Sequence, residues 1–150
     1  NNSSAKGLSY GKKFKIKSII LNYKNPKKAE NLILKNLKRN SINLICLAGF
    51  MKILSKKFIK DFGKKIINIH PSLLPKYKGL NTHKRVIEKK EKFTGCTVHY
   101  VNHELDSGEI ILQKKIKISK NDTPKTLAKK VLKHEHIIYP KAIKKIFTNP

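Results

Sequence analysis

The sequence predicts one α/β domain over residues 1–150, a three-layer arrangement in which helices cover both faces of an open, mostly parallel sheet. Two apolar runs, Ile42–Ala48 and Lys65–His70, are typical of buried strands. Between them, Ser55 begins an amphipathic segment that stops at Gly63, as a capped helix does. A strand, a helix and a second strand at this spacing favour a right-handed βαβ unit with parallel strands.

Two elements are expected before this unit. Phe14–Leu21 is expected to form a strand. Asn25 followed by Pro26 is a typical helix start, and this helix is expected to end near Asn40. Its apolar stripe consists of Ala29, Leu32, Ile33 and Leu37.

Three elements are expected after the unit. Phe93–Val101 and Glu109–Ile118 are expected to form strands. Thr123 and Pro124 begin a long final helix, and Pro140 is expected to kink or interrupt it because proline removes a backbone hydrogen bond. The apolar stripe of this helix consists of Leu127, Val131, Ile138, Ala142 and Ile146.

The charge of the chain is extreme: 35 Lys and Arg oppose nine Asp and Glu, a formal net charge of +26. Only Arg39 and Arg85 are arginine, and aromatic residues make up 7% with no Trp. Base and phosphate recognition prefers Arg and stacking aromatics, so we expect a solvated lysine surface and no specific nucleic-acid partner. A basic nucleic-acid-binding module is the non-enzymatic alternative.

The composition also indicates the cellular compartment of the protein. No apolar run approaches the roughly 20 residues that span a bilayer, so no membrane partner is expected. The first ten residues lack a basic and apolar leader, and two cysteines form no disulfide framework. These features predict a cytoplasmic protein. Cys46 and Cys96 lie in apolar strand contexts and are expected to be core residues.

The most informative stretch contains Asn68 and His70. Side chains alternate along a strand, so these two polar groups share one face, at the end of the strand where open α/β sheets bind ligands. Pro71 and Pro75 stiffen the loop that follows. An imidazole beside a carboxamide suits acid–base work at a carbonyl: the imidazole moves protons and the amide donates to an oxyanion. A purely structural Asn/His pair is the alternative.

Two acidic residues are candidates to complete the site. Asp106, beside the turn residues Ser107 and Gly108, would stabilise the His70 imidazolium and orient its ring if it approached, although it is equally suited to cap the turn. Glu135 falls on or beside the buried stripe of the last helix, where a carboxylate needs a partner; a surface pair with lysine is the alternative.

No metal is expected in the site. The six histidines, two cysteines and nine acidic residues show no zinc-ligand spacing. No glycine-rich phosphate loop occurs in the sequence.

Four segments in this order span essentially the whole chain: Leu47–Ser55, Asn68–Pro75, Asp106–Gly108, and Glu135-His136 with Tyr139-Pro140. Together they resemble the phosphoribosylglycinamide formyltransferases of purine biosynthesis, a branch of the folate-dependent formyltransferases. The Asn, His and Asp pattern alone also resembles formyltetrahydrofolate hydrolases and the methionyl-tRNA formyltransferase catalytic domain. The last segment and Ala48–Met51 favour the glycinamide ribonucleotide branch.

The resemblance implies a role for each matching residue. Asn68 holds the formyl oxygen, His70 is the general acid–base, and Asp106 tunes His70. Glu135 contacts glycinamide ribonucleotide, near its amine. The pocket for 10-formyltetrahydrofolate, the co-substrate, is lined by Asn68 with Met51, Lys52, Ile53, Leu54, Asn102, His103, Glu104, Leu105 and Asp106. The amine attacks the formyl carbon directly, with no metal and no covalent enzyme intermediate.

This sequence differs from the family pattern at both ends and at Pro26. The implied fold is Rossmann-like, and its first strand–loop–helix unit, with the Gly-Ser-Asn phosphate loop, is expected to be missing before Asn1. The family's last hairpin is expected to be missing after Pro150. Pro26 replaces an Arg that contacts the folate, with Lys27 as the nearest substitute. We therefore expect a partial domain, weakly active or inactive by itself.

Overall fold

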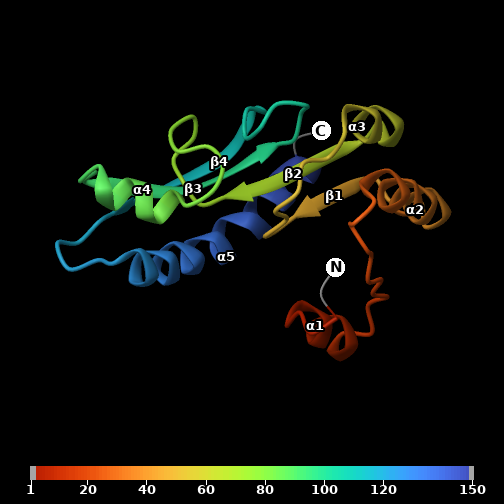
Figure 1. Ribbon diagram of the computed structural model, residues 1–150, viewed down its shortest axis with the longest axis horizontal. Coiled ribbons are helices and arrows are strands. Elements are labelled where there is room, and N and C mark those ends of the chain that lie inside the picture. The colour runs from red at the N-terminus through yellow and green to blue at the C-terminus, as the bar shows by residue number, and fades with distance from the viewer. Residues whose placement is uncertain (1–2, 149–150) are drawn as a thin grey trace. The chain divides into compact units, whose positions relative to one another are not determined.

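The computed structural model describes residues 3–148, which form two compact units, one up to residue 42 and one from residue 43 (Figure 1). The first unit contains α1 (Gly7–Lys13) and α2 (Pro26–Arg39). The second contains β1 (Leu44–Leu47), α3 (Lys56–Phe62), β2 (Lys65–His70), α4 (Thr82–Glu88), β3 (Phe93–Tyr100), β4 (Ile110–Lys117) and α5 (Pro124–Thr148).

The first unit confirms the predicted helix and contradicts the predicted strand. Asn25 caps α2, because its Oδ1 accepts a hydrogen bond from the Lys28 N–H at 3.0 Å. Residues 14–21 form no strand, since no strand among the described residues pairs with them. The buried residues of α2 include Glu30 and Leu34. Leu32 was expected in the buried apolar stripe but is exposed.

The second unit confirms the α/β class, but its sheet is mixed rather than mostly parallel. The strand order is β1-β2-β3-β4; β1 and β2 are parallel, and the other two pairs are antiparallel. The first residues of β3 lie beyond the carboxyl end of β2, so β3 runs back along it. Residues 101–109 join β3 to β4 and are too few for the crossover that a parallel pair needs.

Local signals in the sequence set the ends of several elements. Ser55 caps α3 by accepting from the Phe58 N–H at 3.0 Å, and Gly63 ends the helix with a left-handed φ of 60°. The bounds of β2 are those predicted. Pro140 lies inside α5 without interrupting it. The helix α4 was not anticipated from the sequence.

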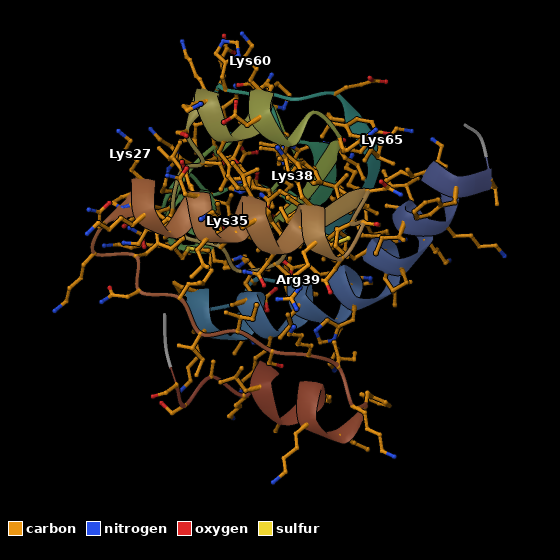
Figure 2. The ribbon with its side chains drawn as sticks, turned by 90° about the vertical axis from the view of Figure 1, so that its right-hand side faces the viewer. Lys27, Lys35, Lys38, Arg39, Lys60 and Lys65 are labelled. Carbon is orange, nitrogen blue, oxygen red and sulfur yellow. The ribbon has the colours of Figure 1, made fainter. Side chains whose placement is uncertain are left out.

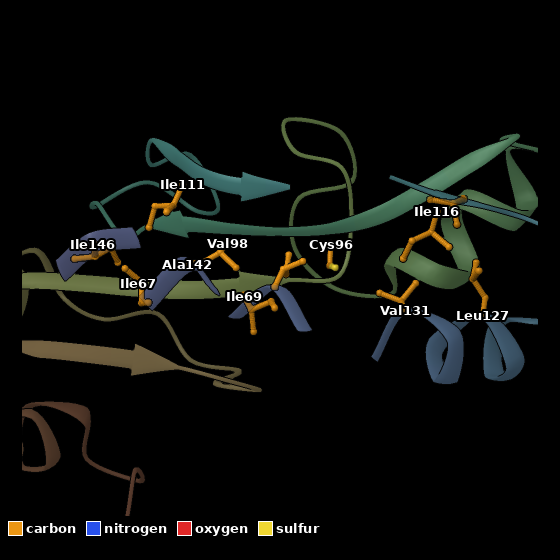
Figure 3. Packing of buried hydrophobic residues seen from close by; sticks show 12 residues of the cluster. Ile67, Ile69, Cys96, Val98, Ile111, Ile116, Leu127, Val131, Ala142 and Ile146 are labelled. Carbon is orange, nitrogen blue, oxygen red and sulfur yellow. The ribbon is translucent and has the colours of Figure 1, made fainter. Parts of the chain in front are cut away.

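One face of the sheet carries the hydrophobic core. Side chains of β2 and β3 on this face pack against α5, whose Leu127 and Val131 are fully buried, and α4 contacts α5 (Figure 3). Cys96 is a core residue as expected. Cys46 is exposed, contrary to expectation. No helix within residues 3–148 has both the length and the apolarity to cross a membrane.

Basic side chains cover the outside of both units. In Figure 2, labelled side chains of α2 point outward in the first unit, as do those of α3 and β2 in the second. The six labelled residues are all exposed: Lys27, Lys35, Lys38, Arg39, Lys60 and Lys65.

Candidate active site

The face of the sheet opposite the core is polar near the carboxyl end of β2. Asn68 and His70 alternate with the core residues of β2, so they share this face. Asn68 is paired with His99 of β3, and His70 with Thr97. Since residues directly opposite in an antiparallel pair lie on the same face, these four polar side chains form one group.

Hydrogen bonds fix the loop that leaves β2. The Thr97 hydroxyl donates to the Ser72 carbonyl oxygen at 2.7 Å and accepts from the Leu74 N–H at 3.2 Å. Gln113 of β4 donates to the Leu74 carbonyl oxygen at 2.8 Å and to the Thr97 hydroxyl at 2.9 Å. The loop therefore lies over β3 in one conformation, and His70 stands at its start.

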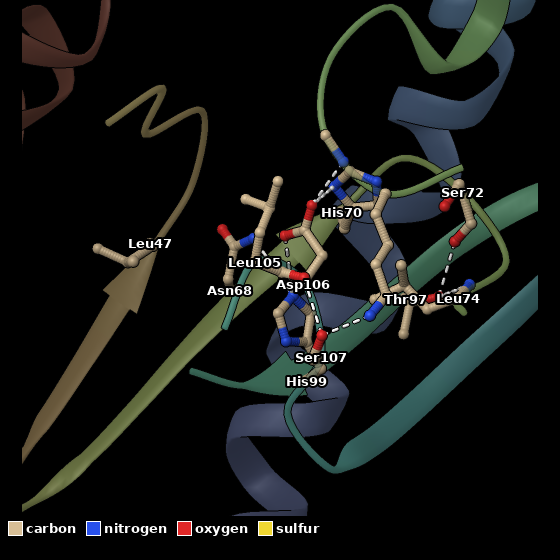
Figure 4. A network of polar contacts seen from close by, with 12 residues as sticks. Leu47, Asn68, His70, Ser72, Leu74, Thr97, His99, Leu105, Asp106 and Ser107 are labelled. Carbon is tan, nitrogen blue, oxygen red and sulfur yellow. Dashed lines mark hydrogen bonds and ion pairs between the residues drawn. The ribbon is translucent and has the colours of Figure 1, made fainter. Parts of the chain in front are cut away.

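Asp106 comes from the connection between β3 and β4 and reaches the same place (Figure 4). Its Oδ2 lies 3.3 Å from His70 Nδ1 and accepts a hydrogen bond from the Gly79 N–H at 2.8 Å. Its backbone is left-handed, with φ of 46°. Only 9% of the Asp106 side chain is exposed, so this carboxylate is held by the histidine and the loop around Gly79 rather than by water.

His70 faces two groups that only accept hydrogen bonds. Its Nε2 donates to the Tyr77 carbonyl oxygen at 2.9 Å, and its Nδ1 faces the Asp106 carboxylate. An imidazole protonated on both nitrogens satisfies both acceptors. The arrangement is therefore suited to hold the imidazolium that acid–base chemistry requires.

His99 has a different environment. Its Nδ1 donates to the Tyr100 carbonyl oxygen at 2.8 Å, and its Nε2 lies 3.4 Å from Asn68 Nδ2 and 3.7 Å from Asp106 Oδ1. Burial lowers the pKa of His99, more than the Tyr100 carbonyl and the Asp106 carboxylate raise it. The His99 imidazole is consequently neutral near neutral pH.

A third histidine, His83 of α4, lines the cleft beside His70. Burial lowers the pKa of His83, and the charge of His70 lowers it further. Its Nδ1 is buried, and within the described residues no hydrogen-bond partner reaches it.

A cleft of about 560 Å³ contains the three predicted catalytic residues, Asn68, His70 and Asp106. Gly49–Ile53 form one wall, and Gly79–His83 form another. The volume is in the range of small-molecule sites. The structure thus brings Asp106, from a distant part of the chain, to Asn68 and His70 of β2.

A smaller pocket adjoins this cleft, and Asn68 and Asp106 line both. The predicted folate residues in its lining are Lys52, Ile53, Leu54, Asn68, Asn102, Glu104, Leu105 and Asp106. Met51 lines the catalytic cleft instead. The His103 side chain is 55% exposed, does not line this pocket, and lies 4.0 Å from Glu104.

Glu135 lies in a separate hollow of about 570 Å³ between α5 and the segment after β1. This hollow shares Gly49, Met51, Ile69 and Pro71 with the catalytic cleft, so the two are adjacent. Burial raises the pKa of the Glu135 carboxyl. Tyr139 ties α5 to the end of β1 by donating from its hydroxyl to the Leu47 carbonyl oxygen at 2.7 Å.

Sequence reasoning did not identify His99, the Tyr77 carbonyl or the Gly79 N–H as parts of the site. Alternation along the predicted strand Phe93–Val101 was a usable signal for His99, because it puts this residue on one face with Thr97. The Tyr77 and Gly79 contacts come from the backbone of an irregular loop and leave no side-chain pattern in the sequence.

Known proteins resemble this chain in sequence and in fold. The family model described as Formyl transferase matches residues 1–143. The chain belongs to the formyl transferase family.

Among individual relatives, phosphoribosylglycinamide formyltransferase of Haemophilus influenzae is 42% identical over 147 residues, 96% of this chain and 69% of that protein. The human trifunctional purine biosynthetic protein adenosine-3 is 40% identical over 146 residues. The match covers 95% of this chain but only 14% of the human protein.

Two crystal structures of phosphoribosylglycinamide formyltransferases are also similar. The protein from Anaplasma phagocytophilum has a TM-score of 0.91 and 42% identity, over 97% of this chain and 71% of that one. The protein from Bacillus halodurans has a TM-score of 0.93 and 34% identity, over 99% and 78% of the two chains.

Proposed function

We propose that this formyl transferase moves the formyl group of 10-formyltetrahydrofolate to the amine of glycinamide ribonucleotide, a step of purine biosynthesis. The observation that carries the proposal is the meeting of Asn68, His70 and Asp106 in one cleft, with His70 Nδ1 3.3 Å from Asp106 Oδ2. The identity of the similar proteins, phosphoribosylglycinamide formyltransferases among them, supports the choice of substrate.

Each catalytic side chain has a task in this reaction. The substrate amine attacks the formyl carbon, the new C–N bond forms, and the formyl oxygen becomes an oxyanion. Asn68 donates an N–H to that oxyanion. His70 transfers the proton lost by the amine to the folate nitrogen as its bond to the formyl carbon breaks. Asp106 holds the His70 ring and stabilises its positive charge.

The His70 Nε2 proton is engaged in this structure. It is donated to the Tyr77 carbonyl oxygen at 2.9 Å. Proton transfer through Nε2 therefore requires that the hydrogen bond to Tyr77 be exchanged for one to the substrate.

We assign the neighbouring pockets to the two substrates. Apolar side chains of Phe50, Ile53, Leu54, Val101 and Leu105 suit the flat ring system of a folate, and polar atoms at their edge give it orientation. Glu135 lines the adjacent hollow, and we assign it to accept hydrogen bonds from glycinamide ribonucleotide. No step of this scheme involves a metal. The cytoplasmic location expected from the sequence stays a prediction.

Formyl transfer tests the proposal directly. It is measured on residues 1–150 and on the same chain with the family's first strand–loop–helix unit joined before Asn1, because the resemblance predicts little activity for residues 1–150 alone. The kcat comparisons below use the more active of the two proteins. With 10-formyltetrahydrofolate and glycinamide ribonucleotide, we expect the formylated ribonucleotide, identified by mass spectrometry. Formate from the folate alone would identify a hydrolase, and formylated methionyl-tRNA would identify the tRNA enzyme. Either product without the formylated ribonucleotide contradicts the proposal.

Substitutions test the assigned roles. His70→Ala removes the proton carrier and should lower kcat by about 10²–10⁴-fold. Asp106→Asn keeps the shape of the side chain but removes its negative charge beside His70. The loss of this charge should lower kcat. Asp61→Asn is the matched control, because Asp61 pairs only with Lys57 on the exposed side of α3. Unchanged turnover in either site variant would show that the roles are wrong.

A further inference from the structure

We propose that His99 is a positioning residue whose neutral imidazole, protonated on Nδ1, orients the Asn68 carboxamide so that one Asn68 N–H faces the catalytic cleft. The inference deepens the proposed function and rests on it, because Asn68 is the residue assigned to the formyl oxygen.

The contacts of His99 determine its tautomer. Its Nδ1 lies 2.8 Å from the Tyr100 carbonyl oxygen, which can only accept, so Nδ1 carries a proton. In a neutral ring Nε2 then has a lone pair and no proton. Asn68 Nδ2 lies 3.4 Å from this Nε2. Only the amide nitrogen of Asn68 can satisfy that lone pair, and this fixes which end of the carboxamide faces His99.

The same contact leaves a donor for the reaction. The Asn68 amide nitrogen carries two hydrogens, and His99 uses one of them. Asn68 lines both the catalytic cleft and the adjoining pocket, at the junction between them. The second N–H has no hydrogen-bond partner within the described residues, so it is available to an oxyanion in the cleft.

Groups around His99 keep the ring neutral. The side chain is 3% exposed, and burial is the main reason that its pKa lies below the usual 6.5. The positive charges of His70 and Lys78 also disfavour protonation. Opposing them are the Tyr100 carbonyl and the Asp106 carboxylate, whose Oδ1 lies 3.7 Å from Nε2.

Protonation of His99 would reverse the arrangement. An Nε2–H would then point at the Asn68 N–H, and two donors in contact repel. The carboxamide would turn to present its oxygen to His99, which moves both N–H groups from their present positions. Turnover should therefore fall as the pH drops through the pKa of His99.

Two variants separate this role from simple packing. His99→Gln places an amide near the former Nε2, where its oxygen accepts from Asn68 and cannot be protonated. His99→Asn reaches only the former Nδ1 position, so it retains a donor for the Tyr100 carbonyl but offers no acceptor to Asn68. Both variants lose the packing of the imidazole. His99→Gln keeps the acceptor for Asn68 and loses the donor to Tyr100, whereas His99→Asn keeps that donor and loses the acceptor. A larger loss of kcat in His99→Asn therefore reports the acceptor, because this variant is the one that retains the Tyr100 contact.

In the formyl-transfer assay we expect His99→Asn to lower kcat by about 10–10²-fold at neutral pH, a large part of the loss of one oxyanion donor, with little change in the KM for the folate. His99→Gln should retain kcat to within about threefold. In a plot of kcat against pH, this variant should also lack the fall at low pH that protonation of His99 causes in the wild type. Equal losses of kcat in the two variants, or full activity in His99→Asn, would overturn the proposal.

A second readout does not depend on activity. Ring ¹⁵N NMR of the wild-type protein should show His99 with a protonated Nδ1 and a bare Nε2, and the Asn68 side-chain amide should shift as His99 titrates. A neutral ring protonated on Nε2 would overturn the proposal. The expected spectra, together with no formylation of glycinamide ribonucleotide, would support the orientation of Asn68 and contradict only the proposed function.

Discussion

At the scale of single residues, the three histidines around the cleft differ in what their ring nitrogens face. His70 faces two acceptors, the Tyr77 carbonyl and the Asp106 carboxylate, and so is suited to carry a charge. The His99 ring has one acceptor partner and one amide donor, which suits the neutral form. The His83 Nδ1 is buried without a partner among the described residues, which also disfavours the charged form.

Lys78 provides a residue-scale prediction, because its charge helps to keep His99 neutral. The Lys78 ammonium also contacts the Ser107 hydroxyl, which holds it beside the Asp106 connection. Lys78→Met removes a positive charge, so the pKa of His99 should rise, and an NMR titration of the His99 ring should measure it. Lys84→Met is the control, since Lys84 is exposed and pairs with Glu88. An unchanged or lower pKa of His99 in Lys78→Met would refute the explanation.

At the scale of elements, the site depends on how closely the connection between β3 and β4 approaches β3. A Cβ on Gly108 would overlap the backbone carbonyl of Tyr100. Close approach thus requires glycine at this position, two residues after Asp106. The backbone hydrogen bond from the Tyr100 N–H to the Glu109 carbonyl oxygen, 2.8 Å long, closes the same turn.

We predict that Gly108→Ala forces this connection away from β3 and displaces Asp106 from His70. The cost should be about 1–3 kcal/mol of the free energy of unfolding, as for other overpacked sites, and kcat should fall as well. Denaturant unfolding and the formyl-transfer assay measure the two effects. Gly7→Ala is the matched control, because nothing lies within 4 Å of a Cβ added there. Wild-type stability and turnover in Gly108→Ala would contradict this account.

The elements also show what a sequence can reveal. Caps and alternation act locally, so the ends of α2, α3 and β2 and the shared face of Asn68 and His70 could be predicted. The mixed sheet was missed, although residues 101–109 are too few for a parallel crossover between the last two strands and were a usable local signal. The approach of Asp106 to His70 could be proposed from the family resemblance, whereas the backbone contacts of the loop around Gly79 could not.

At the scale of the whole molecule, His83, which is partly buried, and His99, which is buried, make stability depend on pH. The pKa values of His83 and His99 are lowered on folding, mainly by burial. As the pH falls, both histidines of the unfolded chain take up protons near pH 6.5, whereas those of the folded protein take up protons only at lower pH. Their contribution to stability is therefore present above that pH and is lost as the pH falls towards their folded values.

We predict that the free energy of unfolding falls between neutral pH and about pH 5, and that the fall is smaller in His83→Gln and His99→Gln. Glu135 acts in the opposite direction, because burial raises its pKa and the folded state then binds the extra proton. Glu135→Gln should thus make the fall steeper. Urea unfolding at several pH values measures these slopes. Equal slopes in the wild type and both histidine variants would contradict the assignment.

The charge of +26 is the other property of the whole molecule. The labelled lysines of Figure 2 lie on exposed surfaces of both units, and none of the six lines the catalytic cleft. A solvated surface of this kind attracts phosphate without fixed geometry, so we predict weak binding to DNA and RNA that is insensitive to their sequence. Affinity should fall about 10³-fold between about 50 mM and 0.2 M salt, as measured by fluorescence anisotropy. Tight binding at 0.2 M salt that depends on nucleotide sequence would instead favour a nucleic-acid-binding module.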